Sequence, residues 1–344
     1  MYNAIICRYH EIAIKGNNRR AFERQLMGNM RYHLRDKVLC KVCQVRGRIW
    51  VEPRDGGFFA ETEVDAIRVV LERVCGLESF SPARFVAPEL EAMAAAVREL
   101  AGPVLARKLT EKAKVTFRIR ARRSNKDFPL DSKGLEIRLA SEVAAVSERD
   151  RLEVDLDNAE VTIGCEVRHE FAAIFVETFR SPGGLPVGCN GRVLALLSGG
   201  IDSPVACYLA MKRGCFVDFL TFHSSPYTPP ETVDKVKRLA AYLNLYQFPG
   251  KLHLCNLAPL QKEIRDRCTE RDRTVLYRRA MLRVAEAVAK RSECEALLTG
   301  EAVGQVASQT LTNMATIARA TQMLVLRPLC GMDKADSIRL AEEL

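Results

Sequence analysis

The segment Ser198-Gly199-Gly200-Ile201-Asp202-Ser203 combines residue types that suit the binding of a phosphate group. Two glycines let the backbone turn tightly and bring N–H groups against an anion. Two serines add hydroxyl donors, and a helix that starts after the segment adds the positive end of its dipole. The segment has no lysine and the chain has no GxGxxG pattern, so neither of the two common nucleotide-binding loops is present. We name residues 198–203 the cradle; its alternative is a strand–helix turn without a ligand, in which Asp202 caps the helix.

The elements around the cradle predict a doubly wound parallel sheet, which is an α/β architecture. Val193–Leu197 is a continuous apolar run, typical of a parallel strand that is buried on both faces. A helix over 203–213 follows the cradle and ends at Gly214. Ligands of such sheets bind at the carboxyl ends of the strands, where the cradle lies. The other predicted elements are strands at 215–222, 251–255, 296–299 and 323–327 and helices at 231–244 and 274–291.

Two α+β units and a linker precede this sheet. Residues 181–191 contain four glycines and two prolines, which indicates a linker. The predicted domains are therefore 1–58, 59–180 and 192–344. We expect the helix at 88–100 to end at Gly102-Pro103. The first domain has strands at 3–7 and 47–52 around a helix at 19–37, and the second has helices at 62–75, 88–100 and 132–146 and strands at 114–122, 153–156, 160–166 and 172–178.

Positive charge is concentrated in two blocks, although the whole chain carries a net charge of only +9. Residues 1–50 hold 11 basic and 3 acidic residues, residues 51–100 hold 5 and 10, and residues 101–126 hold 9 and 1. Such blocks suit a polyanionic partner, because Lys and Arg displace counterions from phosphates. Charge alone fits a merely solvated surface equally well.

The cysteines and the hydropathy exclude two classes of protein. Twelve cysteines are scattered along 344 residues, which predicts reduced, mostly buried thiols rather than a disulfide scaffold. Cys40 and Cys43 form a single CxxC without a second pair or clustered histidines, which argues against a zinc site. The sequence has no apolar run of about 18 residues and no signal-peptide pattern. We therefore expect no membrane span and a cytoplasmic protein.

Several longer motifs resemble the tRNA 4-thiouridine synthetases, also called tRNA sulfurtransferases, which are PP-loop ATP pyrophosphatases. In the C-terminal half these motifs are LLSGGIDSPVACYLAMKRG, TFHSSPYT, LYRRAMLRVAE, LLTGEAVGQVASQTLTNM and LRPLCGMDK. Residues 8–19 resemble the opening motif of the family, and CGLESFSPA, TFRIRARRSNKDFP and LEVDLDNAEVTIGCEVR resemble its THUMP RNA-binding module. The resemblance covers essentially the whole chain. It implies a ferredoxin-like α+β domain, a THUMP domain and a PP-loop domain of the adenine nucleotide alpha hydrolase type.

The resemblance also implies an ATP site and an RNA surface. It gives catalytic roles to Asp202, Ser198 and Ser203, with Asp202 helping to hold Mg²⁺ near the phosphates and no other metal expected. Three of the implied ATP contacts have an alternative role: Phe222 as a plain core residue, Arg278 as a solvated helix arginine and Gln309 as a helix cap. The implied ATP contacts are Leu196, Leu197, Ser198, Gly199, Gly200, Asp202, Ser203, Thr221, Phe222, Arg278, Gly300 and Gln309, and the implied tRNA-backbone surface is Lys114, Arg118, Arg120, Arg122, Arg123 and Lys126.

The implied reaction has two stages. ATP adenylates the C4 oxygen of a uridine in tRNA, and persulfide sulfur then displaces AMP to give 4-thiouridine. The implied partners are tRNA, a cysteine desulfurase as persulfide donor, a sulfur carrier protein for thiamine thiazole synthesis, and a second copy of the chain in a homodimer. The persulfide-bearing cysteine of the family would lie beyond Leu344, and the helix predicted from Asp333 has no stop signal, so we expect the chain to end mid-helix. The alternative is therefore a tRNA-binding PP-loop protein that binds ATP or adenylates without completing sulfur transfer.

Overall fold

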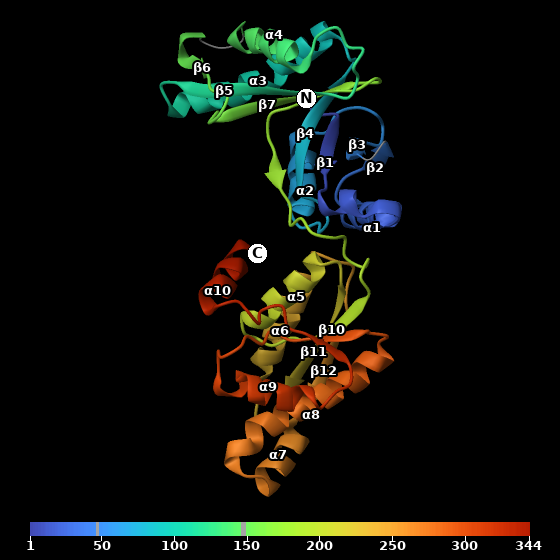
Figure 1. The fold of residues 1–344 in the computed structure, drawn as a ribbon, viewed down its shortest axis with the longest axis vertical. Coiled ribbons are helices and arrows are strands. Elements are labelled where there is room, and N and C mark those ends of the chain that lie inside the picture. The colour runs from blue at the N-terminus through green and yellow to red at the C-terminus, as the bar shows by residue number, and fades with distance from the viewer. Residues whose placement is uncertain (46–47, 146–148) are drawn as a thin grey trace. The chain divides into compact units, whose positions relative to one another are not determined.

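A computed structural model describes residues 1–45, 48–145 and 149–344, which form two compact units (Figure 1). The first unit comprises residues 1–9, 30–72 and 77–181. The second comprises residues 10–29, 73–76 and 182–344. No helix in the described ranges is both long and apolar enough to cross a lipid bilayer.

The first unit is built on one sheet of nine strands, in the order β2-β3-β1-β4-β8-β7-β5-β6 with β9 paired to β4. Strand β4 pairs with β1 on one side and β8 on the other, both antiparallel. The two α+β units predicted from the sequence therefore share a sheet. The strands are β1 (Ala4–Arg8), β2 (Cys40–Val45), β3 (Arg48–Pro53), β4 (Ser79–Val86), β5 (Val115–Arg123), β6 (Leu152–Val154), β7 (Val161–Val167), β8 (Ala172–Phe175) and β9 (Phe179–Arg180).

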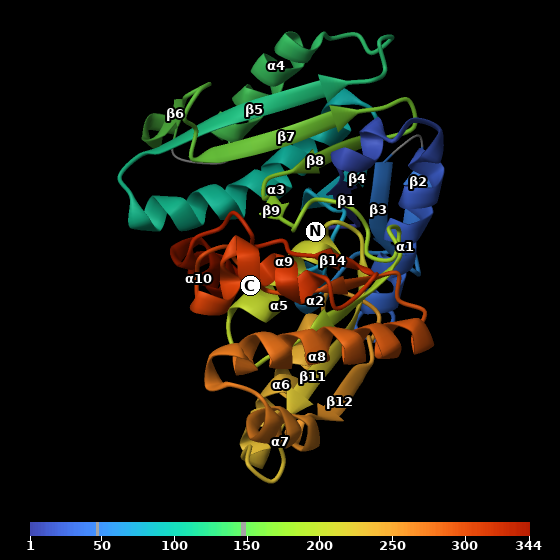
Figure 2. The same ribbon diagram turned by 60° about the horizontal axis from the view of Figure 1, so that its bottom comes forward.

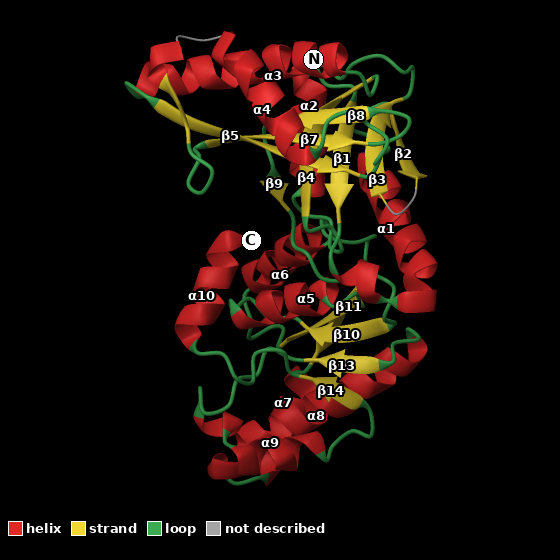
Figure 3. Cartoon of the chain, turned by 45° about the horizontal axis from the view of Figure 1, so that its top comes forward, coloured by secondary structure: helices red, strands yellow, loops and turns green. Residues whose placement is uncertain are grey.

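Helices α3 and α4 pack on the same face of this sheet, where the inward side chains of β5, β7 and β8 join them in one core (Figure 3). The predicted stop at Gly102-Pro103 is wrong, because α3 continues through Pro103. Gly102 has no side chain to oppose the proline ring, and Leu105 is buried beyond it. The helices of the N-terminal half are α1 (Arg19–Leu34), α2 (Glu61–Leu71), α3 (Leu90–Glu111) and α4 (Ser132–Ala145).

The second unit contains the predicted parallel sheet, with five strands in the order β12-β11-β10-β13-β14. One face packs on α5 and α6 and the other on α8 and α9, which confirms a doubly wound fold (Figure 2). Helix α7 was not predicted, because Ala258 is its one buried residue and it has no apolar stripe. The elements are β10 (Arg192–Leu196), β11 (Phe216–His223), β12 (Leu252–Asn256), β13 (Ala296–Leu298), β14 (Leu324–Leu326), α5 (Asp202–Lys212), α6 (Pro230–Leu243), α7 (Ala258–Arg267), α8 (Glu270–Arg291), α9 (Leu311–Ala318) and α10 (Lys334–Glu343).

All twelve cysteines are free thiols, as predicted, but most of them are not fully buried. Five are buried and seven are partly buried, since several lie on the edge strand β12, in linkers or in turns. No group of three or more His, Cys, Asp or Glu side chains in the described ranges could hold a metal ion.

Gly164 in β7 gives a test of the packing in the first unit. A Cβ there would lie 2.1 Å from an atom of the Phe175 ring on the paired strand β8. We expect Gly164→Ala to lower the free energy of unfolding by about 1–3 kcal/mol, because the ring must move. Urea unfolding measures the change. Gly28→Ala, where an added Cβ meets no heavy atom within 4 Å in helix α1, is the control and should leave stability equal or raise it by up to about 1 kcal/mol. An equal effect of the two variants would contradict this packing.

Candidate functional site

The cradle joins the carboxyl end of β10 to the start of α5 and is held by its own serines. The backbone N–H of Ser198 donates to Oγ of Ser203 at 2.9 Å, and the Ser203 hydroxyl lies 3.2 Å from the Ser198 carbonyl oxygen. The two hydroxyl oxygens are 3.0 Å apart, and the Gly200 N–H donates to Ser198 Oγ at 3.4 Å. The serines therefore fix the shape of the loop before any anion is bound.

Gly300 is the second residue after β13 and lies in close contact with the start of α5. A Cβ on Gly300 would lie 2.8 Å from the Ser203 nitrogen and 2.8 Å from the Asp202 carbonyl carbon. These are backbone atoms, so no side chain can move aside to make room. The resemblance implied that Gly300 contacts ATP. The structure shows in addition that Gly300 lies directly against the backbone of the cradle.

A cavity of about 310 Å³ opens beside the cradle. Eight of the predicted ATP contacts line it, together with an apolar wall of Met281, Leu282 and Ile317. Four predicted contacts are not among its lining residues: Leu197 and Thr221 are buried, Phe222 packs partly buried in the core on the α8 side, and Gly199 lies in the loop. The eight lining residues are Leu196, Ser198, Gly200, Asp202, Ser203, Arg278, Gly300 and Gln309.

Asp202 is paired with a lysine that sequence reasoning did not single out. The Lys334 ammonium donates to both carboxylate oxygens of Asp202, at 2.8 and 2.9 Å. The Gln305 side-chain amide donates to the same carboxylate at 3.1 Å. Lys334 belongs to LRPLCGMDK, one of the motifs that carry the resemblance. The motif marks the lysine, but nothing in the sequence pairs it with Asp202.

A second ion-pair cluster borders the cavity at Glu301. Its carboxylate accepts from Arg278 at 2.8 Å and from Arg327 at 2.9 Å. The Thr299 hydroxyl donates to it at 3.0 Å. Arg278 is therefore held in place, rather than being one more solvated helix arginine. Two buried atoms here have no partner, Nη2 of Arg327 and the side-chain oxygen of Gln309.

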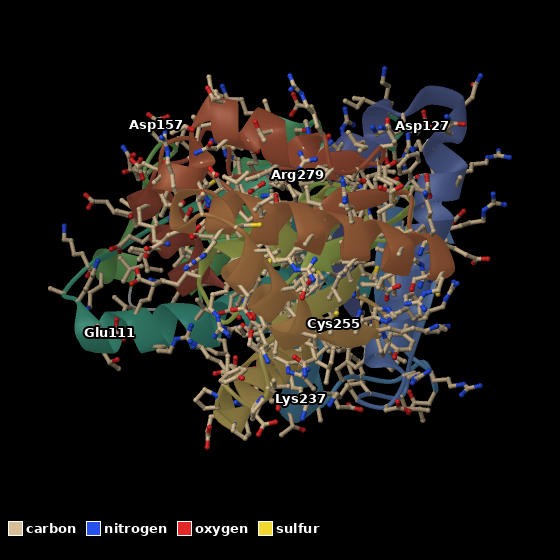
Figure 4. The ribbon with its side chains drawn as sticks, turned by 90° about the horizontal axis from the view of Figure 1, so that it is seen from below. Glu111, Asp127, Asp157, Lys237, Cys255 and Arg279 are labelled. Carbon is tan, nitrogen blue, oxygen red and sulfur yellow. The ribbon has the colours of Figure 1, made fainter. Side chains whose placement is uncertain are left out.

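The six basic residues of the predicted RNA surface differ in how the first unit uses them. Arg118 donates to the Thr162 hydroxyl and to the carbonyls of Leu156 and Asp157, in the turn where Asp157 is labelled in Figure 4. Arg123 donates to the carbonyls of Lys126 and Phe128. These two arginines therefore support neighbouring loops. The other four, Lys114, Arg120, Arg122 and Lys126, are exposed, and of these Arg120 also donates to the Leu156 carbonyl at 3.2 Å.

Most thiols of the chain are poor nucleophiles. Burial raises the pKa of Cys207, which lies in α5 directly after the cradle, and that side chain is inaccessible. Burial also raises the pKa of Cys75 to about 12 and that of Cys294 to about 11. Since the thiolate is the reactive form, these groups fit the predicted structural role.

Three family models match the chain in order. The model described as "ThiI ferredoxin-like domain" matches residues 4–81, and "THUMP domain" matches residues 89–177. The model described as "Thiamine biosynthesis protein (ThiI)" matches residues 188–344, which include the cradle and the cavity.

Relatives similar to the whole chain carry one name. A "Probable tRNA sulfurtransferase" of Moorella thermoacetica is 39% identical over 344 residues, covering 100% of this chain and 84% of the relative. One of Alkaliphilus oremlandii is 37% identical over 349 residues, covering 100% and 85%.

Two solved structures are similar over the whole length. The first is a complex of a 4-thiouridine synthetase with RNA and bound ATP, with a TM-score of 0.86 and 33% identity over 100% of this chain and 85% of the other. The second is a protein of Pyrococcus horikoshii, with a TM-score of 0.75 and 26% identity over 99% of both chains.

The contact at Gly300 gives a test of the site. We expect Gly300→Ala to displace the cradle, so that ATP raises the thermal unfolding midpoint less in the variant than in the parent chain. Gly331→Ala is the control, because an added Cβ there meets no heavy atom within 4 Å. Calorimetry with and without ATP measures both. An undiminished rise in Gly300→Ala would show that the close contact is not needed.

Proposed function

Because the chain belongs to the tRNA sulfurtransferase family, we propose that it uses ATP to adenylate the C4 oxygen of a uridine in tRNA. The terminal sulfur of a persulfide then displaces AMP and forms a disulfide link to C4, and a second thiol cleaves that link, which releases 4-thiouridine and leaves a disulfide between the two thiols. The observation that carries the proposal is the set of residues around the cavity: the glycine- and serine-rich cradle, an apolar wall, and fixed cations at its border.

The cavity is lined by polar and by apolar residues, which suit the phosphates and the adenine of ATP. Met281, Leu282 and Ile317 offer the apolar surface that an adenine ring needs, and the unpartnered oxygen of Gln309 can accept a hydrogen bond from an amino group. The cradle and the start of α5 offer N–H groups and a positive dipole to the phosphates.

Preorganised cations suit the charge that develops during adenylation. A uracil carbonyl oxygen is a poor leaving group, and adenylation turns it into part of AMP, which leaves readily. Negative charge grows on the phosphates as the pyrophosphate departs, and donors fixed in advance stabilise that charge without reorganising. Lys334 and Arg278 are fixed in this way by Asp202 and Glu301.

Mg²⁺ fits the site as an ion carried by ATP. Among the described residues that line the cavity, the carboxylates are those of Asp202 and Glu301. Glu301 accepts hydrogen bonds from two arginines and a threonine, and Asp202 accepts them from Lys334 and Gln305. Asp202 belongs to the cradle, so Mg²⁺ would share this carboxylate with Lys334. Mg²⁺ is commonly held by one or two carboxylates together with substrate phosphates, and it would neutralise phosphate charge here.

The exposed cations of β5 support tRNA as the substrate. Arg120 and Arg122 alternate along the strand, so both leave the face that packs on the helices. Contacts of this kind bind the RNA backbone and position it without reading sequence. We also propose a cysteine desulfurase as persulfide donor, a sulfur carrier protein for thiamine synthesis, a homodimer, and the cytoplasm, where tRNA is modified.

One observation favours the alternative, a protein that adenylates tRNA without completing sulfur transfer. Every cysteine of the chain is buried or partly buried, and burial raises the pKa of ten of the twelve thiols, which lowers their thiolate fraction. Cys330, in the turn between β14 and α10, is partly buried.

A single reaction mixture separates the two functions. The purified chain is incubated with unmodified tRNA, ATP, Mg²⁺, a cysteine desulfurase with cysteine, and a small thiol as reductant. We expect tRNA-dependent release of pyrophosphate and formation of 4-thiouridine, measured by mass spectrometry of the digested tRNA. Asp202→Ala should lower both by at least about tenfold, because Lys334 loses its anchor. Pyrophosphate without 4-thiouridine would support the alternative, and the absence of both would overturn the proposal.

The RNA surface has its own test. We expect the double variant Arg120→Ala, Arg122→Ala to bind tRNA more weakly and to lower the salt dependence of binding by about one unit of slope per lost phosphate contact. Arg118→Ala is the comparison: it should act chiefly on stability, because this partly buried guanidinium donates to a hydroxyl and two carbonyls of the chain, whereas the exposed Arg120 donates to one carbonyl. Filter binding over a series of salt concentrations measures the slope. An unchanged slope in the double variant would remove these residues from the surface.

A further inference from the structure

Lys235 in α6 lies over the cradle, and no sequence motif singled it out. A Cβ built on Gly199 would meet one side chain only, that of Lys235, with its Cδ at 3.4 Å, its Cε at 3.8 Å and its Nζ at 4.0 Å. The alkyl chain of the lysine therefore runs across the first glycine of the cradle and brings its ammonium group to the loop.

Packing of α6 fixes this approach. Val236, Ala240 and Leu243 lie on one side of the helix and are buried in the core beside α5. Lys235 directly precedes the first of them and is itself exposed. Helix α6 follows β11, the strand next to β10, so its side chains can reach the end of β10 where the cradle begins.

The charge of Lys235 is not balanced within the described part of the chain. No carboxylate there forms an ion pair with Lys235, whereas Lys237 on the same helix pairs with Asp234 at 2.9 Å and Lys334 pairs with Asp202. The ammonium also lies near the start of α5, which is the positive end of a helix dipole. The acid in the first turn of α5, Asp202, is paired with Lys334, so it does not balance the charge of Lys235. The lysine and the helix start therefore favour an added anion between them.

We propose that Lys235 binds the β- and γ-phosphates of ATP and holds the pyrophosphate as it leaves. This inference rests on the proposed adenylation. Lys235 lies against Gly199 of the cradle, which offers its N–H groups to the phosphates, so the lysine meets the nucleotide at its phosphate end. As the bond between the α-phosphorus and its bridging oxygen breaks, negative charge moves onto the pyrophosphate, where the ammonium donates hydrogen bonds to it.

Binding of three ligands tests the assignment. Isothermal titration gives the affinities of ATP, inorganic pyrophosphate and AMP for the parent chain and for Lys235→Met, which keeps the length of the side chain and removes its charge. We expect ATP and pyrophosphate to bind about tenfold more weakly to the variant, the loss of one charge-assisted contact, and AMP to bind equally well. Lys235→Arg should recover most of the loss.

Lys237→Met is the matched control, because Lys237 (labelled in Figure 4) is an exposed lysine two residues further along α6. It should leave all three affinities unchanged. An equal loss of AMP affinity in Lys235→Met would point to a distorted helix and overturn the assignment, as would full ATP and pyrophosphate affinity. Failure of the parent chain to bind ATP would instead overturn the proposed function, so the two failures are distinguishable.

Discussion

The backbone contact between Gly300 and the first residues of α5 is the constraint on which the site depends. It brings the ends of β10 and β13, neighbours in the parallel sheet, to the two sides of one loop. The cradle is thereby held by the hydrogen bonds of its own serines and by the backbone of Gly300, which cannot move aside as a side chain could. Residues that follow β13, Glu301 and Gln305, then reach the cavity and the Asp202 carboxylate.

Around this fixed loop acids hold cations in place, and at Glu301 they do so without neutralising them. Asp202 fixes Lys334, and Glu301 fixes two arginines with a single negative charge. A site of this kind has donors in place before its ligand arrives, which is the condition under which they act on developing charge at little cost in reorganisation. The acids at the site therefore serve mainly to orient bases.

The sequence predicted the local parts of this site and not the contacts between them. The apolar run at 193–197 and the glycines after it carry a strong short-range signal, because a buried parallel strand and a tight turn each restrict residue types. Arg278, Glu301 and Arg327 meet across 23 and 26 residues, and Lys334 meets Asp202 across 132, so no spacing rule relates them.

The error at Gly102-Pro103 has a similar origin: burial of the following turn outweighed a local stop signal. The shared sheet of the N-terminal half also escaped sequence reasoning, because strand pairing between distant segments leaves no periodicity.

That shared sheet has a consequence for how the N-terminal half can be divided. Strand β4 lies between β1 and β8, so a cut of the chain near residue 58 separates β1 from the strand that completes it. One fragment would then expose unpaired backbone groups along β1 and the other along β4, and such strand edges pair with other chains. The two family modules that meet in this sheet are thus bound to one another as a single folding unit, and a fragment that carries only one of them is predisposed to self-association.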